Sequence, residues 1–222
     1  MAVLYLFDID GTLLHSRSGR MAFDATIAEL HGMREACTGI AFGGKTDPLI
    51  VDEVFSARFG RAASADEHAA FFEAYVPRLR AMLAEHGVQV IEGVIEALAY
   101  LATRDVVLGV ATGNIRAGAD AKLAAGELQR WFVLGGYGCD SRVRAELVAR
   151  AIERGRARAE VSEVVVVGDT VHDIAAARAC GALVCAVVTG GDSAEQLAAA
   201  DAVFASLAEL PAWHAARYGA GS

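Results

Sequence analysis

The stretch Ala2-Val-Leu-Tyr-Leu-Phe-Asp-Ile-Asp-Gly-Thr12 places an unbroken apolar run directly before a turn that carries two acids. Six apolar residues without polar alternation are typical of a strand buried on both faces, as in a parallel sheet. Gly11 lets the backbone turn sharply, and Thr12 can hold the turn by hydrogen bonding. We therefore predict a buried parallel strand with Asp8 and Asp10 at its carboxyl end.

The same pattern recurs further along the chain. The runs Val106–Ala111 and Val164–Val167 are each followed at once by a polar or glycine turn and then by a helical pattern. Weaker strands are predicted at 183–188 and 202–204, and helices at 94–104, 115–126, 141–156, 172–180 and 194–199. Alternating strands and helices indicate right-handed crossovers. We predict an α/β fold, a Rossmann-like doubly wound parallel sheet, with its chemistry at the carboxyl ends of the strands.

About 90 residues separate the first predicted strand from the second, far more than one crossover needs. This insert contains helical patterns at 20–31, 47–59 and 65–85. Asp47-Pro48 resembles an N-cap followed by proline at the first helical position, and Ser64 to Glu67 has capping-box spacing. We therefore predict a small all-α cap domain, residues 15–86, inserted between strands 1 and 2 of a core domain formed by 1–14 and 87–222.

Composition excludes several classes of protein. The 222 residues include 20 basic and 28 acidic side chains, for a net charge of −8, and no basic run occurs. A nucleic-acid or anionic-membrane partner is therefore not expected. The four cysteines lack CxxC spacing, which favours reduced thiols over a zinc site or disulfide scaffold. The apolar start lacks the basic lead of a signal peptide, so we predict a cytoplasmic protein, either monomer or homodimer.

Acids follow two of the predicted strands. Asp8 and Asp10 lie two residues apart, so we expect their carboxyl groups to converge and to repel unless a cation relieves them. Mg²⁺, which prefers oxygen ligands, is a natural solution. Asp169 follows the valine-rich strand and could reach the same ion, and Asp173 could orient its ligands or waters. Ordinary turn formation and helix capping are the competing explanations.

Two further groups are candidates for binding an anion or a substrate. Thr112, Gly113 and Asn114 follow a strand and open a helix, an arrangement that suits phosphate, although an ordinary N-cap would look the same. Lys45 is the only lysine of the insert and a candidate substrate contact. His15 and Arg17, near the start of the insert, are weaker candidates.

Three of these segments resemble the motifs of a known family. Phe7-Asp-Ile-Asp-Gly-Thr-Leu13 resembles the first motif of the haloacid dehalogenase-like hydrolase superfamily, Val110-Ala-Thr-Gly-Asn114 the second, and Val166-Val-Gly-Asp-Thr-Val-His-Asp173 the fourth. Glu92-Gly-Val94 and Gly43-Gly-Lys-Thr-Asp47 are similar to the phosphoglycolate phosphatase-like branch. The helical insert resembles the cap domain of that branch.

The resemblance implies a Mg²⁺-dependent phosphatase that hydrolyses a small phosphorylated metabolite, a phosphomonoester. Asp8 would be the nucleophile that becomes an aspartyl-phosphate. Asp10 would protonate the leaving oxygen and then activate water, and its backbone carbonyl would ligate the metal. Asp169 would complete the protein's share of the metal shell, with Asp173 behind it. The phosphoryl oxygens would be held by Thr112, Gly113 and Asn114.

The third family motif departs from its usual form, because no lysine occurs between Gly135 and Glu163. Arg142 and Arg144 are the candidates to supply the cation. We select Arg144, because the spacing of Arg-Ala-Glu-Leu before a helix looks like an arginine variant of the motif. A planar guanidinium differs in geometry from an ammonium.

Other functions remain open from the sequence. A phosphonatase would cleave a carbon–phosphorus bond with Lys45 as the Schiff-base lysine. A sensor would bind a phosphometabolite without turnover, although the intact Asp8, Asp10 and Asp169 argue against it. The identity of the phosphorylated substrate is not determined by these motifs.

Overall fold

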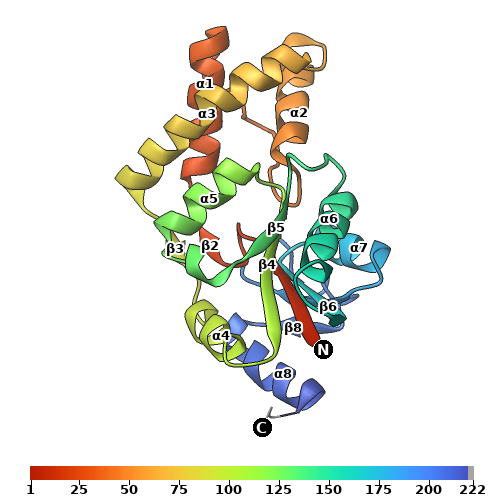
Figure 1. Ribbon diagram of the computed structural model, residues 1–222. Helices are drawn as coiled ribbons and strands as arrows, with labels where there is room; N and C mark the ends of the chain where they lie inside the picture. The colour runs from red at the N-terminus through yellow and green to blue at the C-terminus, as the bar shows by residue number, and fades with distance from the viewer. Residues whose placement is uncertain (220–222) are drawn as a thin grey trace.

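The computed structural model describes residues 1–219 and is built around a six-stranded parallel sheet (Figure 1). The strands run side by side in the order β5-β4-β1-β6-β7-β8. Their bounds are β1 Ala2–Phe7, β4 Val106–Thr112, β5 Leu134–Tyr137, β6 Val161–Gly168, β7 Leu183–Val187 and β8 Ala202–Phe204. The predicted Rossmann-like, doubly wound α/β fold is confirmed.

Strand β1 occupies the centre of the sheet. It pairs in parallel with β4 on one side and with β6 on the other, so that Leu4 lies between Val107 and Val164. All six residues of β1 are buried, because strands flank it and helices cover both faces. This position explains why its sequence is continuously apolar rather than alternating.

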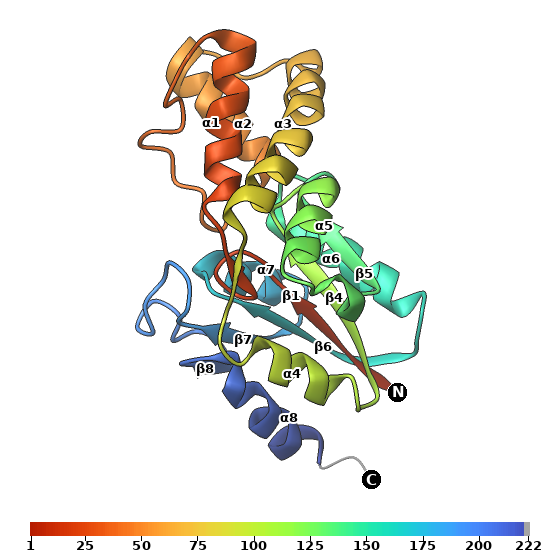
Figure 2. The same cartoon turned by 90° about the vertical axis from the view of Figure 1, so that its left-hand side faces the viewer.

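Helices lie on both faces of the sheet (Figure 2). On one face, Tyr5 and Phe7 belong to a hydrophobic cluster that includes residues of α4, α5 and α8; on the other face, Leu4 and Leu6 cluster with residues of α6 and α7. The alternation follows from the two-residue period of a strand. The helix bounds are α4 Val94–Leu101, α5 Arg116–Ala125, α6 Arg144–Arg156, α7 Val171–Ala179 and α8 Leu210–Tyr218, with single 3₁₀ turns at Gln129–Trp131 and Leu207–Glu209.

Three further helices stand above the carboxyl ends of the strands (Figure 1). These cap helices are α1 Ser18–His31, α2 Asp47–Phe59 and α3 Ala65–His86, and they share a hydrophobic cluster that includes Phe23, Phe71 and Tyr75. The two passages between cap helices and sheet pair as short antiparallel strands, β2 Leu14–His15 and β3 Gln89–Val90. The separate cluster supports residues 15–86 as a cap domain, a division that stays a prediction.

Several local predictions can be compared with the structure. The capping box at Ser64 is confirmed at the start of α3. The N-cap of α2 is Thr46, so the prediction that Asp47 caps its own helix was wrong. Residues 194–199 form turns instead of an α-helix. Strand β5 was not predicted, because its Leu-Gly-Gly-Tyr sequence lacks a strand signature. Gly136 is needed there for close packing, since a Cβ atom would lie 1.9 Å from the Leu147 carbonyl oxygen.

None of the helices within residues 1–219 combines the length and the apolar character that crossing a membrane would need.

Candidate active site

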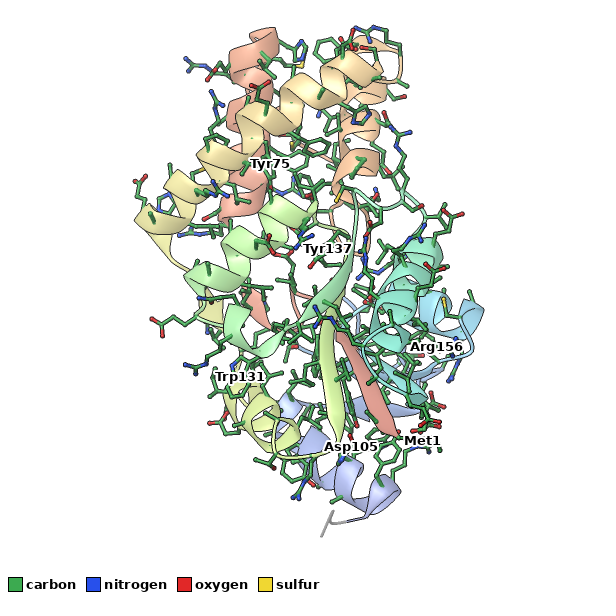
Figure 3. The ribbon with its side chains drawn as sticks, in the orientation of Figure 1. Met1, Tyr75, Asp105, Trp131, Tyr137 and Arg156 are labelled. Carbon is green, nitrogen blue, oxygen red and sulfur yellow. The ribbon has the colours of Figure 1, made fainter. Side chains whose placement is uncertain are left out.

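A cavity of about 220 Å³ lies where the carboxyl ends of the strands meet the cap helices. Met1 and Asp105 mark the opposite end of the sheet, away from the cap (Figure 3). The turns after β1, β4 and β6, the start of α6 and residues 43–47 of the cap, here called the cap loop, all contribute to the cavity wall. Eight of the nine predicted site residues line it: Asp8, Asp10, Lys45, Thr112, Gly113, Asn114, Arg144 and Asp169.

Three buried carboxylates form a tight acidic cluster next to this cavity. Asp8, Asp169 and Asp173 each offer an oxygen atom, and these atoms lie within 4.8 Å of one another. Burial raises the pKa of Asp169 to about 8, and repulsion from the two neighbouring acids adds to the effect. Burial likewise raises the pKa of Asp8 to about 6, although Arg144 opposes the shift. A hard divalent cation such as Mg²⁺ fits this donor set, because it would relieve the repulsion between buried oxygen ligands.

Two glycines allow the backbone to approach Asp169 closely. Gly11 has φ +88°, and a Cβ atom there would lie 2.5 Å from Asp169 Oδ2. A Cβ atom on Gly190, in the loop after β7, would lie 1.6 Å from the same oxygen. Asp169 accepts hydrogen bonds from Thr12 Oγ1 at 3.0 Å and from the Gly191 N–H at 3.3 Å. The carboxylate is therefore held in one orientation by surrounding backbone that leaves no room for side chains.

Arg144 supplies the cation at the acidic cluster. Its Nη2 lies 3.0 Å from Asp8 Oδ1, and it donates to Asp173 Oδ1 through Nε at 2.9 Å and Nη2 at 2.6 Å. The two carboxylates raise the pKa of this buried guanidinium against the opposing effect of its burial. Asp173 Oδ2 accepts from the N–H and hydroxyl of Thr170 at 3.1 and 2.6 Å. Asp173 therefore fixes Arg144 from behind, while Arg144 itself reaches the predicted nucleophile.

Asp10 is not part of the acidic cluster, although it lines the same cavity as Asp8 and its charge contributes to raising the pKa of Asp8. The two carboxylate oxygens of Asp10 accept from Lys122 Nζ at 2.8 and 2.7 Å, and Oδ2 also accepts from Asn114 Nδ2 at 2.7 Å. Lys122, on α5, was missed by the sequence analysis. A signal was available: the chain has 18 arginines but only two lysines, and both lysines line this cavity.

The predicted phosphate-binding turn is enclosed by the cap. Thr112 Oγ1 accepts from the backbone N–H of Asn114 at 3.3 Å and from its side-chain amide at 2.8 Å. The Asp47 N–H donates to the Gly113 carbonyl at 2.7 Å, and Asp47 Oδ2 accepts the Ile115 N–H at 2.8 Å. Asp47 therefore caps the start of α5 in the core rather than its own helix. Burial raises its pKa to about 6, against the lowering effect of Lys122.

Comparison with known proteins agrees with this arrangement. The family model described as haloacid dehalogenase-like hydrolase matches residues 3–181. The protein is a haloacid dehalogenase-like hydrolase. This hydrolase is 33% identical to phosphoglycolate phosphatase of Rhodospirillum rubrum over 94% of this chain and 89% of that protein. It is 30% identical to "Probable phosphatase IndB" of Dickeya dadantii over 90% and 87% of the two chains. These relatives support its place in the phosphoglycolate phosphatase-like branch.

The fold of the hydrolase is also found among solved structures. The crystal structure of CbbY from Rhodobacter sphaeroides in complex with phosphate superposes with a TM-score of 0.75 and covers 95% of this chain and 96% of its own. The two sequences are 22% identical, so this similarity concerns the fold alone.

The remaining candidates of the hydrolase take different positions. Arg142 pairs with Asp52 at 3.3 Å and contacts His68 at 3.0 Å, so it joins the core to the cap and does not reach the acidic cluster. Lys45 donates to Glu53 at 2.5 Å at the cavity wall. His15 and Arg17 line a separate surface depression. Of the two candidate arginines, Arg144 alone contacts the predicted nucleophile.

Proposed function

We propose that this haloacid dehalogenase-like phosphatase is a Mg²⁺-dependent enzyme that hydrolyses a small phosphomonoester through an aspartyl-phosphate on Asp8. One observation carries the proposal: two carboxylates with different surroundings line the same capped cavity. One is buried beside an arginine, and the other is held by separate hydrogen-bond donors. Asp8 contacts Arg144, and Asp10 is held by Asn114 and Lys122. A nucleophile and an acid–base group in distinct environments are what stepwise phosphoryl transfer needs.

The chemistry follows from these positions. A carboxylate oxygen of Asp8 attacks phosphorus, the bond to the leaving oxygen breaks, and Asp10 donates a proton to that oxygen. In the second half, Asp10 takes a proton from water as the water oxygen attacks phosphorus. The phosphorus–Asp8 bond then breaks, which releases inorganic phosphate and restores Asp8. Most of the remaining catalysis in such reactions is positioning and charge stabilisation.

The cation and the phosphate-binding residues divide the remaining tasks. Asp8 and Asp169, together with the Asp10 backbone carbonyl, would hold Mg²⁺, which would neutralise negative charge on the phosphoryl group. Asp173 would stay behind Arg144 and keep it aimed at the phosphoryl oxygens. Thr112 with the amides of Gly113 and Asn114 would bind those oxygens as well.

The size and charge of the cavity support a small substrate. About 220 Å³ leaves room for a phosphoryl group and a compact leaving group under the cap loop. Lys45 is the cap residue that we propose to contact the leaving group, and its salt bridge with Glu53 would have to rearrange for this contact. We propose that the enzyme acts in the cytoplasm as a monomer or homodimer, without nucleic-acid or membrane partners.

The phosphonatase alternative is weakened by the surroundings of Lys45. A Schiff-base lysine must present a free amine to the substrate carbonyl, whereas Lys45 Nζ is engaged by the Glu53 carboxylate at 2.5 Å. Borohydride trapping in the presence of phosphonoacetaldehyde would reveal this activity as covalent capture at Lys45. The sensor alternative predicts binding of phosphorylated compounds without release of phosphate.

The direct test is phosphate release from p-nitrophenyl phosphate with Mg²⁺ and with EDTA. We expect turnover that requires Mg²⁺ and is abolished in Asp8→Asn, while the matched surface variant Asp105→Asn keeps it. Acid quenching during turnover, followed by peptide mass spectrometry, should find a phosphoryl group on Asp8. Metal-independent turnover, or substantial activity in Asp8→Asn, would contradict the proposal. A panel of phosphorylated metabolites then ranks substrates by kcat/KM.

A further inference from the structure

Lys122 is a buried lysine that the family motifs do not include. It lies on α5 and is 5% exposed. A buried ammonium needs compensating acceptors, and three are found: both oxygens of Asp10, at 2.8 and 2.7 Å, and Asn114 Oδ1 at 2.7 Å. These three bonds use the full donor capacity of one ammonium group.

These bonds also decide how Asn114 is oriented. Lys122 is a donor only, so it must face the amide oxygen of Asn114. The amide nitrogen consequently points the other way, where it donates to Thr112 Oγ1 at 2.8 Å and to Asp10 Oδ2 at 2.7 Å. Asp10 is thus held by two donors, the charged Lys122 and the neutral amide of Asn114. The orientation of the Asn114 amide in turn depends on Lys122.

Without such support, the Asp10 side chain would have freedom to rotate. Its side chain is 40% exposed to the cavity, whereas the Lys122 side chain is 6% exposed. Asp10 also lies outside the buried acidic cluster that contains Asp8. A carboxylate on the open side of a cavity has several rotamers available, and catalysis requires one of them.

The cap encloses Lys122 from the other side. A Cβ atom on Gly19 of α1 would lie 3.4 Å from Lys122 Nζ, so α1 passes directly over the ammonium. The Asp47 carboxylate is also near enough for its charge to interact with that of Lys122. Lys122 therefore contacts Asp10 and Asn114 in the core at the point where the cap covers both.

We propose that Lys122 is a positioning residue that holds the Asp10 carboxyl group toward the leaving-group oxygen of the substrate. The inference rests on the proposed function, because it concerns the orientation of Asp10, the group proposed to protonate the leaving oxygen. Lys122 itself neither gives up nor accepts a proton. The proton moves from Asp10 to the leaving oxygen as the phosphorus–oxygen bond breaks and the phosphorus–Asp8 bond forms.

The competing explanation is that Lys122 only stabilises the boundary between cap and core. Two small substrates separate these explanations. Ethyl phosphate has a leaving group that must be protonated, whereas acetyl phosphate releases acetate, which leaves as a stable anion. Loss of Asp10 positioning should impair hydrolysis of the first far more than that of the second. A general loss of packing should impair both equally.

The experiment measures kcat/KM for both compounds from phosphate release by Lys122→Met. We expect a loss of about 100-fold with ethyl phosphate and of less than about 10-fold with acetyl phosphate. Lys122→Gln retains an amide donor group, so its kcat/KM ratio between the two substrates should lie between those of wild type and Lys122→Met. It also provides the test if Lys122→Met does not fold. Arg116→Met removes an exposed cation from the same helix and should leave the ratio of the two values unchanged.

A double-mutant cycle with Asp10→Asn provides the second readout. Once Asp10 is removed, Lys122→Met should change ethyl phosphate hydrolysis by no more than about 2-fold, because the two residues act through one another. Equal losses on both substrates, or additive losses in the cycle, would overturn the positioning role alone. A wild-type enzyme that hydrolyses only acetyl phosphate would overturn proton transfer by Asp10 and this role with it. A wild type that hydrolyses neither compound nor p-nitrophenyl phosphate would overturn the proposed function as well.

Discussion

Replacing Asp169 by asparagine should stabilise the metal-free protein while removing its response to Mg²⁺. The carboxyl group of Asp169 is buried beside Asp8 and Asp173, and its pKa rises from 3.8 to about 8. Ionising it in the folded state therefore costs free energy that the unfolded chain does not incur. An asparagine keeps the shape of the side chain and removes the charge.

The magnitude can be worked from this shift. Each pKa unit corresponds to about 1.4 kcal/mol, so at pH 8 the raised value represents about 5 kcal/mol of lost stability. Asp8 shares the same repulsion, so we assign about half of this to Asp169. The Gly191 N–H, which donates to Asp169 Oδ2 at 3.3 Å, would lose its acceptor at a cost of about 1 kcal/mol. The remaining gain of about 1.5 kcal/mol corresponds to a Tm increase of about 3–6 °C for a chain of this length.

The assay is thermal unfolding at pH 8 in EDTA and in saturating Mg²⁺. Wild type should gain stability with Mg²⁺, and Asp169→Asn should start higher and respond little. Asp105→Asn, an exposed site far from the cavity, is the matched control and should behave as wild type. Because the folded-state pKa lies above the unfolded value, metal-free wild type should lose stability as pH rises from about 4 to about 8. A lower metal-free Tm for Asp169→Asn, or an undiminished Mg²⁺ response, would refute the reasoning.

Three further substitutions test other parts of the site. Gly190→Ala should displace Asp169 and raise the Mg²⁺ concentration for half-maximal activity by at least about 10-fold, whereas Gly191→Ala, which has open space around it, should not. Asp47→Ala removes the acceptor at the start of α5, which should cost about 1 kcal/mol of stability and lower Tm by about 2–4 °C. The same variant should raise KM, and an unchanged KM would argue against a role for Asp47 in closing the cavity. Arg144→Lys should lower kcat by about 10- to 100-fold, because one ammonium cannot bridge both carboxylates in the manner of a guanidinium; wild-type kcat in this variant would exclude that requirement.

The strands that could be predicted are those whose continuous apolar sequence itself indicates burial on both faces. β1 and β6 are apolar or valine-rich because helices cover both faces of the sheet. The bounds of β1 were predicted correctly, whereas β6 begins three residues before and ends one residue after the predicted run 164–167. β5 could not be found in this way, because its two glycines serve close packing, Gly136 against α6 and Gly135 against Tyr137 and Val110, and have low strand propensity. The turn residues at the carboxyl ends were predictable because a parallel sheet gathers them at one edge.

The contacts that were missed connect residues far apart in the sequence. Asp47 looked like a local cap, but its carboxylate binds the backbone of Ile115, 68 positions away. Lys122 pairs with Asp10 over 112 positions and lies on a helix without any family motif. The Asp47 contact depends on how the cap docks onto the core, and the Lys122 contact depends on how α5 packs beside the turn after β1. Sequence periodicity carries no information about either arrangement. The choice of Arg144 over Arg142 likewise depended on a motif resemblance, and the structure places only Arg144 at Asp8.

Because lysine is scarce in this hydrolase, amine-reactive reagents can modify only a few sites on it. Lys45 and Lys122 carry its only two side-chain amines, and both line the cavity of the candidate active site. A reagent that acylates amines therefore has, besides the chain terminus, one partly accessible target on the cap and one that the docked cap shields. The rate at which the shielded amine becomes modified would report how often the cap lifts from the core, without any engineered label.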